Sequence, residues 1–79
     1  MFAYTVCEIQ NGTIGSNSWV FNDPNKTDLE NMRAALAKYH AVLSVAATST
    51  VLVHSCVILR DDGLQVASEG YDNRPKTEE

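Results

Sequence analysis

Few residues of this chain are of a type that does chemistry, and the most noticeable pair is His54 and Cys56. Side chains two positions apart on a strand point to the same face, and Cys7 is a candidate to join them there from a second strand-like segment. Imidazole and thiolate groups are preferred ligands of zinc, but a structural zinc site needs four ligands. The fourth candidate, His40, falls in a predicted helix at the edge of its buried stripe. We therefore predict no metal site and no cofactor.

As a general base and a nucleophile, His54 and Cys56 are poorly arranged, because neighbours on one strand lie side by side and several ångströms apart. No third group that would orient the base is evident in the sequence. Asp61 and Asp62 precede Gly63, which is typical of a turn rather than of a cation site. We therefore predict no catalytic residue and expect the chain not to be an enzyme.

The formal net charge is −4, from six Lys and Arg against ten Asp and Glu in 79 residues. Such a chain repels a phosphate backbone, and its basic residues are too scattered to form a stripe, so nucleic-acid binding is disfavoured. Three cationic or titratable side chains remain candidates for contact with an anionic ligand or a partner. They are Lys38, His54 and Arg60.

The apolar stretches are far shorter than the roughly 18 residues that cross a bilayer. The first residues lack the charged region of a signal peptide. We therefore expect no membrane association and a cytoplasmic location. A chain of 79 residues has room for one hydrophobic core and no second domain.

Asn11-Gly12 lies between two strand-like runs, which is a strong signal for a two-residue hairpin turn. Such a turn places Gln10 opposite Thr13, and counting outward places Tyr4 opposite Trp19. The aromatic residues then share one face of the hairpin. A bulge or a longer loop early in the second strand is the alternative that the sequence leaves open.

A capping box at Thr27 and Glu30 predicts the start of a helix. Apolar residues then recur at steps of three and four, the pattern of a helix with one buried face, while Asn31 falls off that stripe. The members of the stripe include Leu29, Met32, Leu36, Tyr39 and Leu43. The helix is predicted over residues 28–47.

A second hairpin is predicted around the turn Arg60-Asp61-Asp62-Gly63. A two-residue turn pairs Leu59 with Val66, whereas a three-residue loop with a bulge pairs Ile58 with Val66. The sequence does not choose between these registers.

The predicted fold is a single α+β domain over residues 1–71, of ββαββ type. Its four-stranded antiparallel sheet carries one amphipathic helix packed on one face. The strands are predicted at about residues 2–10, 13–22, 51–59 and 64–71. The polar residues 72–79 are predicted to form a disordered tail.

The third predicted strand is apolar on both sides, although one helix covers only one face of a sheet. Three residues of the first hairpin are predicted on the uncovered face as well: Ile9, Ile14 and Val20. An uncovered apolar face usually meets another protein surface, and a second copy is the simplest one. We therefore expect a homodimer with these three residues on its contact face. A short, half-buried row that needs no partner is the alternative.

The segment from Leu36 to Tyr71 resembles a group of small uncharacterised proteins of Gram-positive bacteria, gut metagenomes and their phages. The residues that carry the resemblance are Lys38-Tyr39-His40, Leu43, Ala46-Ala47-Thr48-Ser49, Val53-His54-Ser55, Asp61-Asp62-Gly63 and Ser68-Glu69. These motifs are structural, and the resemblance implies the same hairpin, helix and hairpin. Many small acidic proteins of phages and mobile elements inhibit host defence systems such as CRISPR effectors.

The function expected from the sequence is therefore that of a non-enzymatic protein-interaction module. By analogy of size and genomic company, it is an anti-CRISPR-like inhibitor that binds a host protein in the host cytoplasm. A dimeric sponge or sensor for a small anionic ligand, held between protomers by Lys38, His54 or Arg60, is a second hypothesis. A small structural or accessory protein is a third.

Overall fold

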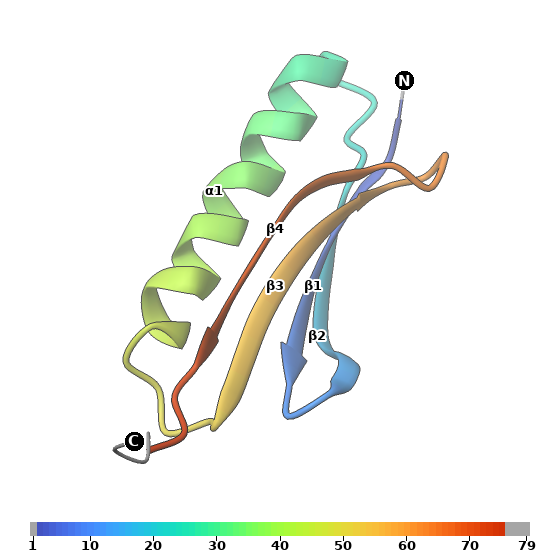
Figure 1. Ribbon diagram of the computed structural model, residues 1–79. Coiled ribbons are helices and arrows are strands. Elements are labelled where there is room, and N and C mark those ends of the chain that lie inside the picture. The colour runs from blue at the N-terminus through green and yellow to red at the C-terminus, as the bar shows by residue number, and fades with distance from the viewer. Residues whose placement is uncertain (1, 76–79) are drawn as a thin grey trace.

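The computed structural model describes residues 2–75, without the side chains of residues 14–16. Its elements are β1 (Tyr4–Gln10), β2 (Thr13–Phe21), α1 (Asp28–Ala46), β3 (Val53–Arg60) and β4 (Gln65–Asp72). The strands form one antiparallel sheet in the order β2-β1-β3-β4, and α1 lies across one face of it (Figure 1). The predicted ββαββ fold is thus confirmed.

The turn of the first hairpin has the predicted conformation, with positive φ at Asn11 (52°) and Gly12 (85°). Gln10 pairs with Thr13 as expected, but the register then shifts between Glu8 and Ile9. Tyr4 therefore pairs with Phe21 and not with Trp19. Because the shift amounts to two residues, every described side chain keeps its predicted face.

Polar contacts fix the start of α1. The Thr27 hydroxyl accepts from the Glu30 amide (3.1 Å), and the Glu30 carboxylate accepts from the Thr27 amide (2.8 Å), which confirms the capping box. The Asp28 carboxylate accepts from the Phe2 amide and from the Tyr4 hydroxyl, both at 2.9 Å. The first turn of the helix is therefore fastened to the beginning of β1.

The prediction for the first turn of the apolar stripe is wrong, because Leu29 is 48% exposed whereas Asn31 is buried (1% exposed). The Asn31 amide donates to the carbonyls of Asp23 (3.1 Å) and Thr27 (3.2 Å), and its oxygen accepts from the Asp23 amide (2.9 Å). The loop that leads into the helix has backbone groups to satisfy, so an amide is more useful here than an apolar side chain.

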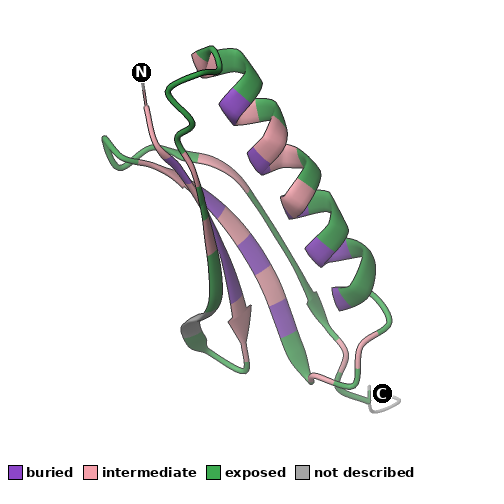
Figure 2. Ribbon diagram, turned by 180° about the vertical axis from the view of Figure 1, so that it is seen from behind, coloured by how far each residue is buried: buried purple, intermediate pink, exposed green. Residues whose placement is uncertain are grey.

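The core lies between α1 and the covered face of the sheet. Buried and partly exposed residues alternate along β3 (Figure 2), as the two-residue period of a strand requires. The core cluster consists of Tyr4, Val6, Ala35, Tyr39, Val42, Leu43, Cys56 and Ile58. One sheet face and one helix thus make up the apolar interior.

The second hairpin has a three-residue loop, in which Arg60 pairs with Leu64 and Gly63 adopts a φ of 93°. A bulge at Val66 then pairs Leu59 with Gln65 and Ile58 with Ala67, so neither predicted register occurs.

The fold extends past residue 71, where the tail was predicted to begin. Strand β4 ends at Asp72. The Asn73 side chain donates to the carbonyls of Ala46 (3.0 Å) and Val51 (3.1 Å). Its backbone N–H donates to the Leu52 carbonyl (2.6 Å). Asn73 thereby joins the end of β4 to the end of α1. Residues 76–79, the rest of the predicted tail, lie outside the described residues.

We predict that Gly70→Ala lowers the free energy of unfolding by about 1–3 kcal/mol, measured by urea denaturation. A Cβ at Gly70 would lie 2.7 Å from the Cβ of Ser55, its cross-strand partner. Adding Ser55→Gly to this variant removes the clash and restores much of the loss, whereas Ser68→Ala, two residues away, has little effect. A Gly70→Ala variant as stable as the wild type would contradict the close approach of β3 and β4.

Candidate functional site

A buried acid–base pair lies beneath the C-terminal half of the helix. Glu8 of β1 and His54 of β3 are 8% and 2% exposed, and His54 Nε2 contacts Glu8 Oε2. Both side chains point to the covered face, because Glu8 pairs with Cys56 and His54 is two residues from Cys56. Glu8 was not among the site residues predicted from the sequence. The sequence does hold one sign of its position: Glu8 is two residues from Val6 and four from Tyr4, so its carboxylate shares their face of β1, which forms the core.

Hydrogen bonds extend this pair at both ends. The Asn17 amide of β2 donates to the other carboxylate oxygen of Glu8, Oε1 (2.7 Å). The Ser49 hydroxyl, in the loop after α1, lies 2.9 Å from His54 Nδ1 and accepts from the Val51 amide (3.1 Å). A chain of polar contacts therefore runs from β2 through β1 and β3 to the loop that follows the helix. We call these four side chains, Asn17, Glu8, His54 and Ser49, the polar chain.

The electrostatics of the polar chain favour a charged Glu8. Burial opposes ionisation of this carboxyl, but hydrogen bonds from Asn17 and His54 outweigh burial and hold its pKa below the ordinary value. The Ser49 hydroxyl donates to a neutral His54 or accepts from a protonated one, because a hydroxyl does both. The imidazole therefore keeps a partner on each nitrogen in either state.

Serine, imidazole and carboxylate occur here in the order used by serine hydrolases, but the geometry differs. In those enzymes the serine faces Nε2 and the carboxylate accepts from Nδ1–H. In this chain Ser49 faces Nδ1, Glu8 faces Nε2, and the serine oxygen already accepts from Val51. The imidazole is also covered by the fold. The arrangement suits a cross-link between segments of the chain better than nucleophilic attack.

The two cysteines do not meet. Cys7 pairs with Val57 and Cys56 pairs with Glu8, which puts the thiols on opposite faces of the sheet. The candidate grouping of Cys7 with His54 and Cys56 is therefore wrong. Burial and the nearby Glu8 raise the pKa of Cys56 to about 11, so its reactive thiolate is scarce at neutral pH. Within residues 2–75, no group of three or more His, Cys, Asp or Glu side chains is arranged to hold a metal ion.

The three predicted contact residues lie apart. The Lys38 ammonium sits 4.2 Å from the centre of the Trp19 ring. Arg60 lies over the Phe2 ring (4.1 Å) and forms a two-point hydrogen-bonded pair with Asp62. His54 is six residues from Arg60 along β3, or about 20 Å. Since His54 is buried in the polar chain, it lies away from the surface that a partner would touch.

The face of the sheet opposite the helix has three cross-strand rows of aligned side chains. The first row is Val20, Thr5, Leu59 and Gln65; the second is Ser18, Cys7, Val57 and Ser68; the third includes Ile9, Ser55 and Gly70. We call this set the open face. These rows contain no ionisable carboxylate or ammonium group, although charged residues make up 20% of the chain. Asp72 lies at the rim, where it pairs with Arg74 (2.6 Å).

Two of the three predicted contact-face residues are placed as expected. Ile9 and Val20 lie on the open face, and Val20 is 58% exposed. The backbone of Ile14 pairs with that of Ile9, but the Ile14 side chain lies outside the described part of the structure.

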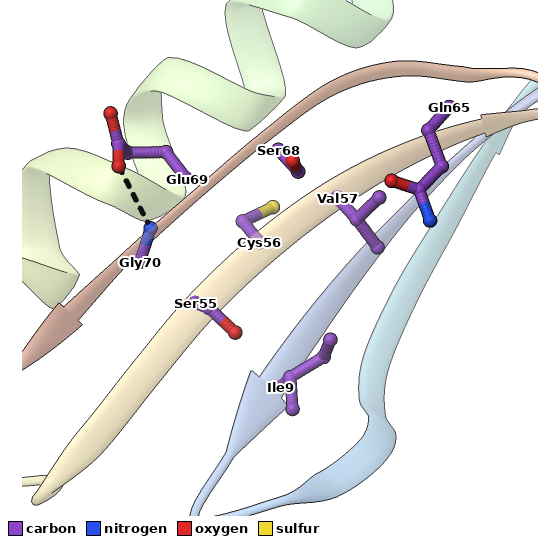
Figure 3. A pocket seen from close by; sticks show the side chains of 8 residues that line it. All are labelled: Ile9, Ser55, Cys56, Val57, Gln65, Ser68, Glu69 and Gly70. Atoms are coloured by element: carbon purple, nitrogen blue, oxygen red, sulfur yellow. Dashed lines mark hydrogen bonds between the residues drawn. The ribbon is translucent and has the colours of Figure 1, made fainter.

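A hollow of about 470 Å³ occupies the β3–β4 side of the open face (Figure 3). It exists because Ser55, Ser68 and Gly70 are small. The lining consists of Ile9, Ser55, Cys56, Val57, Gln65, Ser68, Glu69 and Gly70. The open face is therefore uneven, with the exposed apolar side chain of Val20 on its β2 side and a depression on its β4 side.

The chain matches no protein-family model, no curated protein and no solved structure. Among the described residues, no helix has the length and apolar character needed to cross a membrane.

We predict that Glu8→Gln lowers the free energy of unfolding at pH 7 by about 1–3 kcal/mol, since a buried charge-assisted hydrogen bond is weakened. Because the folded-state pKa of Glu8 is lowered, its contribution is complete above the ordinary carboxyl range and is lost as the pH falls through that range and below it. The difference between wild type and variant therefore shrinks on acidification, as measured by urea denaturation from pH 7 to pH 3. Glu69→Gln, an exposed change on β4, is the control. A difference that grows on acidification would contradict the ionised Glu8.

We also expect no reaction of Ser49 with a fluorophosphonate probe, measured by intact mass, because its oxygen is engaged and its histidine is buried. A one-equivalent adduct that disappears in Ser49→Ala would contradict the structural role of the polar chain.

Proposed function

We propose that this chain is a non-enzymatic protein-binding module whose contact surface is the open face. One observation carries the proposal: a sheet face bearing Ile9, Val20, Val57 and Leu59, with no charged group in its three rows, is left uncovered by the only helix described within residues 2–75. Apolar surface removed from water contributes about 25 cal/mol per Å², and an uncharged face loses no ion hydration when it is covered.

The size of the domain supports the same proposal. The core cluster has eight side chains and belongs to one sheet face and one helix. A core in a domain of this length rarely supplies more than about 3–5 kcal/mol alone. A partner on the open face would stabilise the folded state by mass action and would bury the second side of β1 and β3.

For the biological setting we propose inhibition of a bacterial defence system by binding one of its proteins. The resemblance of residues 36–71 to small phage and Gram-positive proteins supports this setting, together with the acidic charge. The surface geometry supports protein binding in general and does not select a particular host protein.

The hypothesis of an anionic ligand has less support from the geometry. Lys38 and Arg60 lie on separate parts of the molecule and contact aromatic rings, and Arg60 is also paired with Asp62. The hollow of the open face is lined by hydroxyl, amide and apolar groups, and the Glu69 carboxylate at its edge is directed toward the helix side. Neither place gathers positive charge for an anion.

The test is affinity capture with an immobilised, tagged chain from a lysate of Gram-positive cells that also express an untagged copy. We expect Val57→Glu, in the middle of the open face, to abolish a capture that the wild type shows, because a carboxylate would have to be buried without a partner. Val45→Glu is the matched control: Val45 is 63% exposed on α1, and the variant adds the same charge. Circular dichroism confirms that both variants fold.

Capture that is equal for the two variants, or absent for the wild type, would contradict the proposed surface. Mass spectrometry of the proteins lost only with Val57→Glu tests the setting. A component of a defence system among them supports inhibition, and its absence from a host with active defence systems counts against it.

A further inference from the structure

We propose that the partner seated on the open face is a second copy of this chain, held back to back with its two-fold axis parallel to the strands. This inference rests on the proposed function, because it names the occupant of the same face in the chain on its own; a host protein that binds there displaces the second copy. Three observations support it: the distribution of charge, the area of the face and its uneven shape.

Charge opposes contact between two copies over most of their surface. Each copy carries a formal charge of −4, so any two copies repel each other through most of their surfaces. The three rows of the open face contain no charged side chain, and Asp72 at the rim is neutralised by Arg74. This face therefore brings two copies together without burying like charges, whereas a basic partner would find no carboxylate in these rows to pair with.

The area fits a weak, reversible dimer. Four strands about 4.8 Å apart and three rows about 6.6 Å apart cover about 19 Å by 20 Å, or about 400 Å² on each copy. Two such faces bury about 800 Å² in total, the size of a weak and transient contact rather than of a permanent one. We therefore expect a dissociation constant in about the high micromolar range.

The shape selects the direction of the axis. Val20 is an exposed apolar residue of the edge strand β2, and the hollow lies toward the other edge strand, β4. A two-fold axis parallel to the strands sets β2 of one copy over β4 of the other, so that Val20 lies over the Gln65 end of the hollow twice. An axis across the strands would set β2 over β2 and leave the two hollows facing each other. Only the first arrangement fills the depression.

The polar groups of the hollow are compatible with this arrangement. Ser55, Ser68 and Gln65 line the hollow and are partly or fully exposed. Neutral hydroxyl and amide groups at an interface bond to each other or to trapped water without the cost of burying ions.

Sedimentation equilibrium over a dilution series of the untagged chain tests the proposal. The wild type is expected to be dimeric at high concentration, and Val20→Glu to weaken the dimer about tenfold or more, because its carboxylate would enter the hollow unpaired. Val45→Glu, with the same change of charge on the helix, is expected to leave the dissociation constant unchanged.

A charge pair tests the direction of the axis. Gln65→Lys alone is expected to weaken the dimer, and its combination with Val20→Glu is expected to recover much of the lost affinity, since the two introduced charges then face each other between copies. Within one copy Val20 and Gln65 lie on opposite edge strands, so an internal pair does not account for a recovery.

A wild type that stays monomeric at every concentration overturns the inference, as does a dimer that Val20→Glu leaves intact or a double variant without recovery. The same experiments distinguish failure of the second-copy inference from failure of the proposed function. A monomeric wild type that still captures another protein, with capture lost in Val57→Glu, overturns the second-copy inference and leaves the binding surface standing. A monomeric wild type that captures nothing overturns both.

Discussion

The contact between Glu8 and His54 is the interaction on which the rest of the sheet depends. The two residues belong to different hairpins, and they meet where β1 and β3, the middle strands, pair. A buried carboxylate without its imidazole is costly, so any slip of one hairpin along the other carries a large penalty. We interpret the pair as a device that selects the register of the central strands. Its partners Asn17 and Ser49 pass the same constraint to β2 and to the loop after the helix.

The helix is held against this sheet by apolar packing along its length and by polar contacts at both ends. Asp28 binds the start of β1, and Asn73 binds the end of the helix from the far end of β4. The two contacts involve residues from opposite ends of the described chain. A helix with a modest core beneath it is thereby aligned over the sheet, which leaves the other side of the same four strands free to meet a partner.

Local signals were sufficient to predict much of this fold, because turns and caps depend on a few adjacent residues. Asn11-Gly12 and the capping box at Thr27 are of this kind. The side-chain faces were also predictable, since a two-residue bulge preserves them. The polar chain was not, because Glu8 is 9 residues from Asn17 and 46 residues from His54, and Glu8 and His54 become neighbours only when the hairpins join. Burial of Asn31 was missed for a similar reason. Its partners are backbone groups of the loop before the helix, and no pattern in the sequence indicates the path of that loop.

The order of the strands has a consequence for the kinetics of folding. Each hairpin closes over a short segment, but Tyr4 pairs with Arg60 across 56 positions of the chain. Closing so long a loop is entropically slow, so the hairpins are expected to form early and their joining to limit the rate. Because Glu8 and His54 meet only when the hairpins join, the polar chain forms no earlier than this step. The central seam, rather than either hairpin, is therefore the place where a substitution is expected to change how long the native state persists.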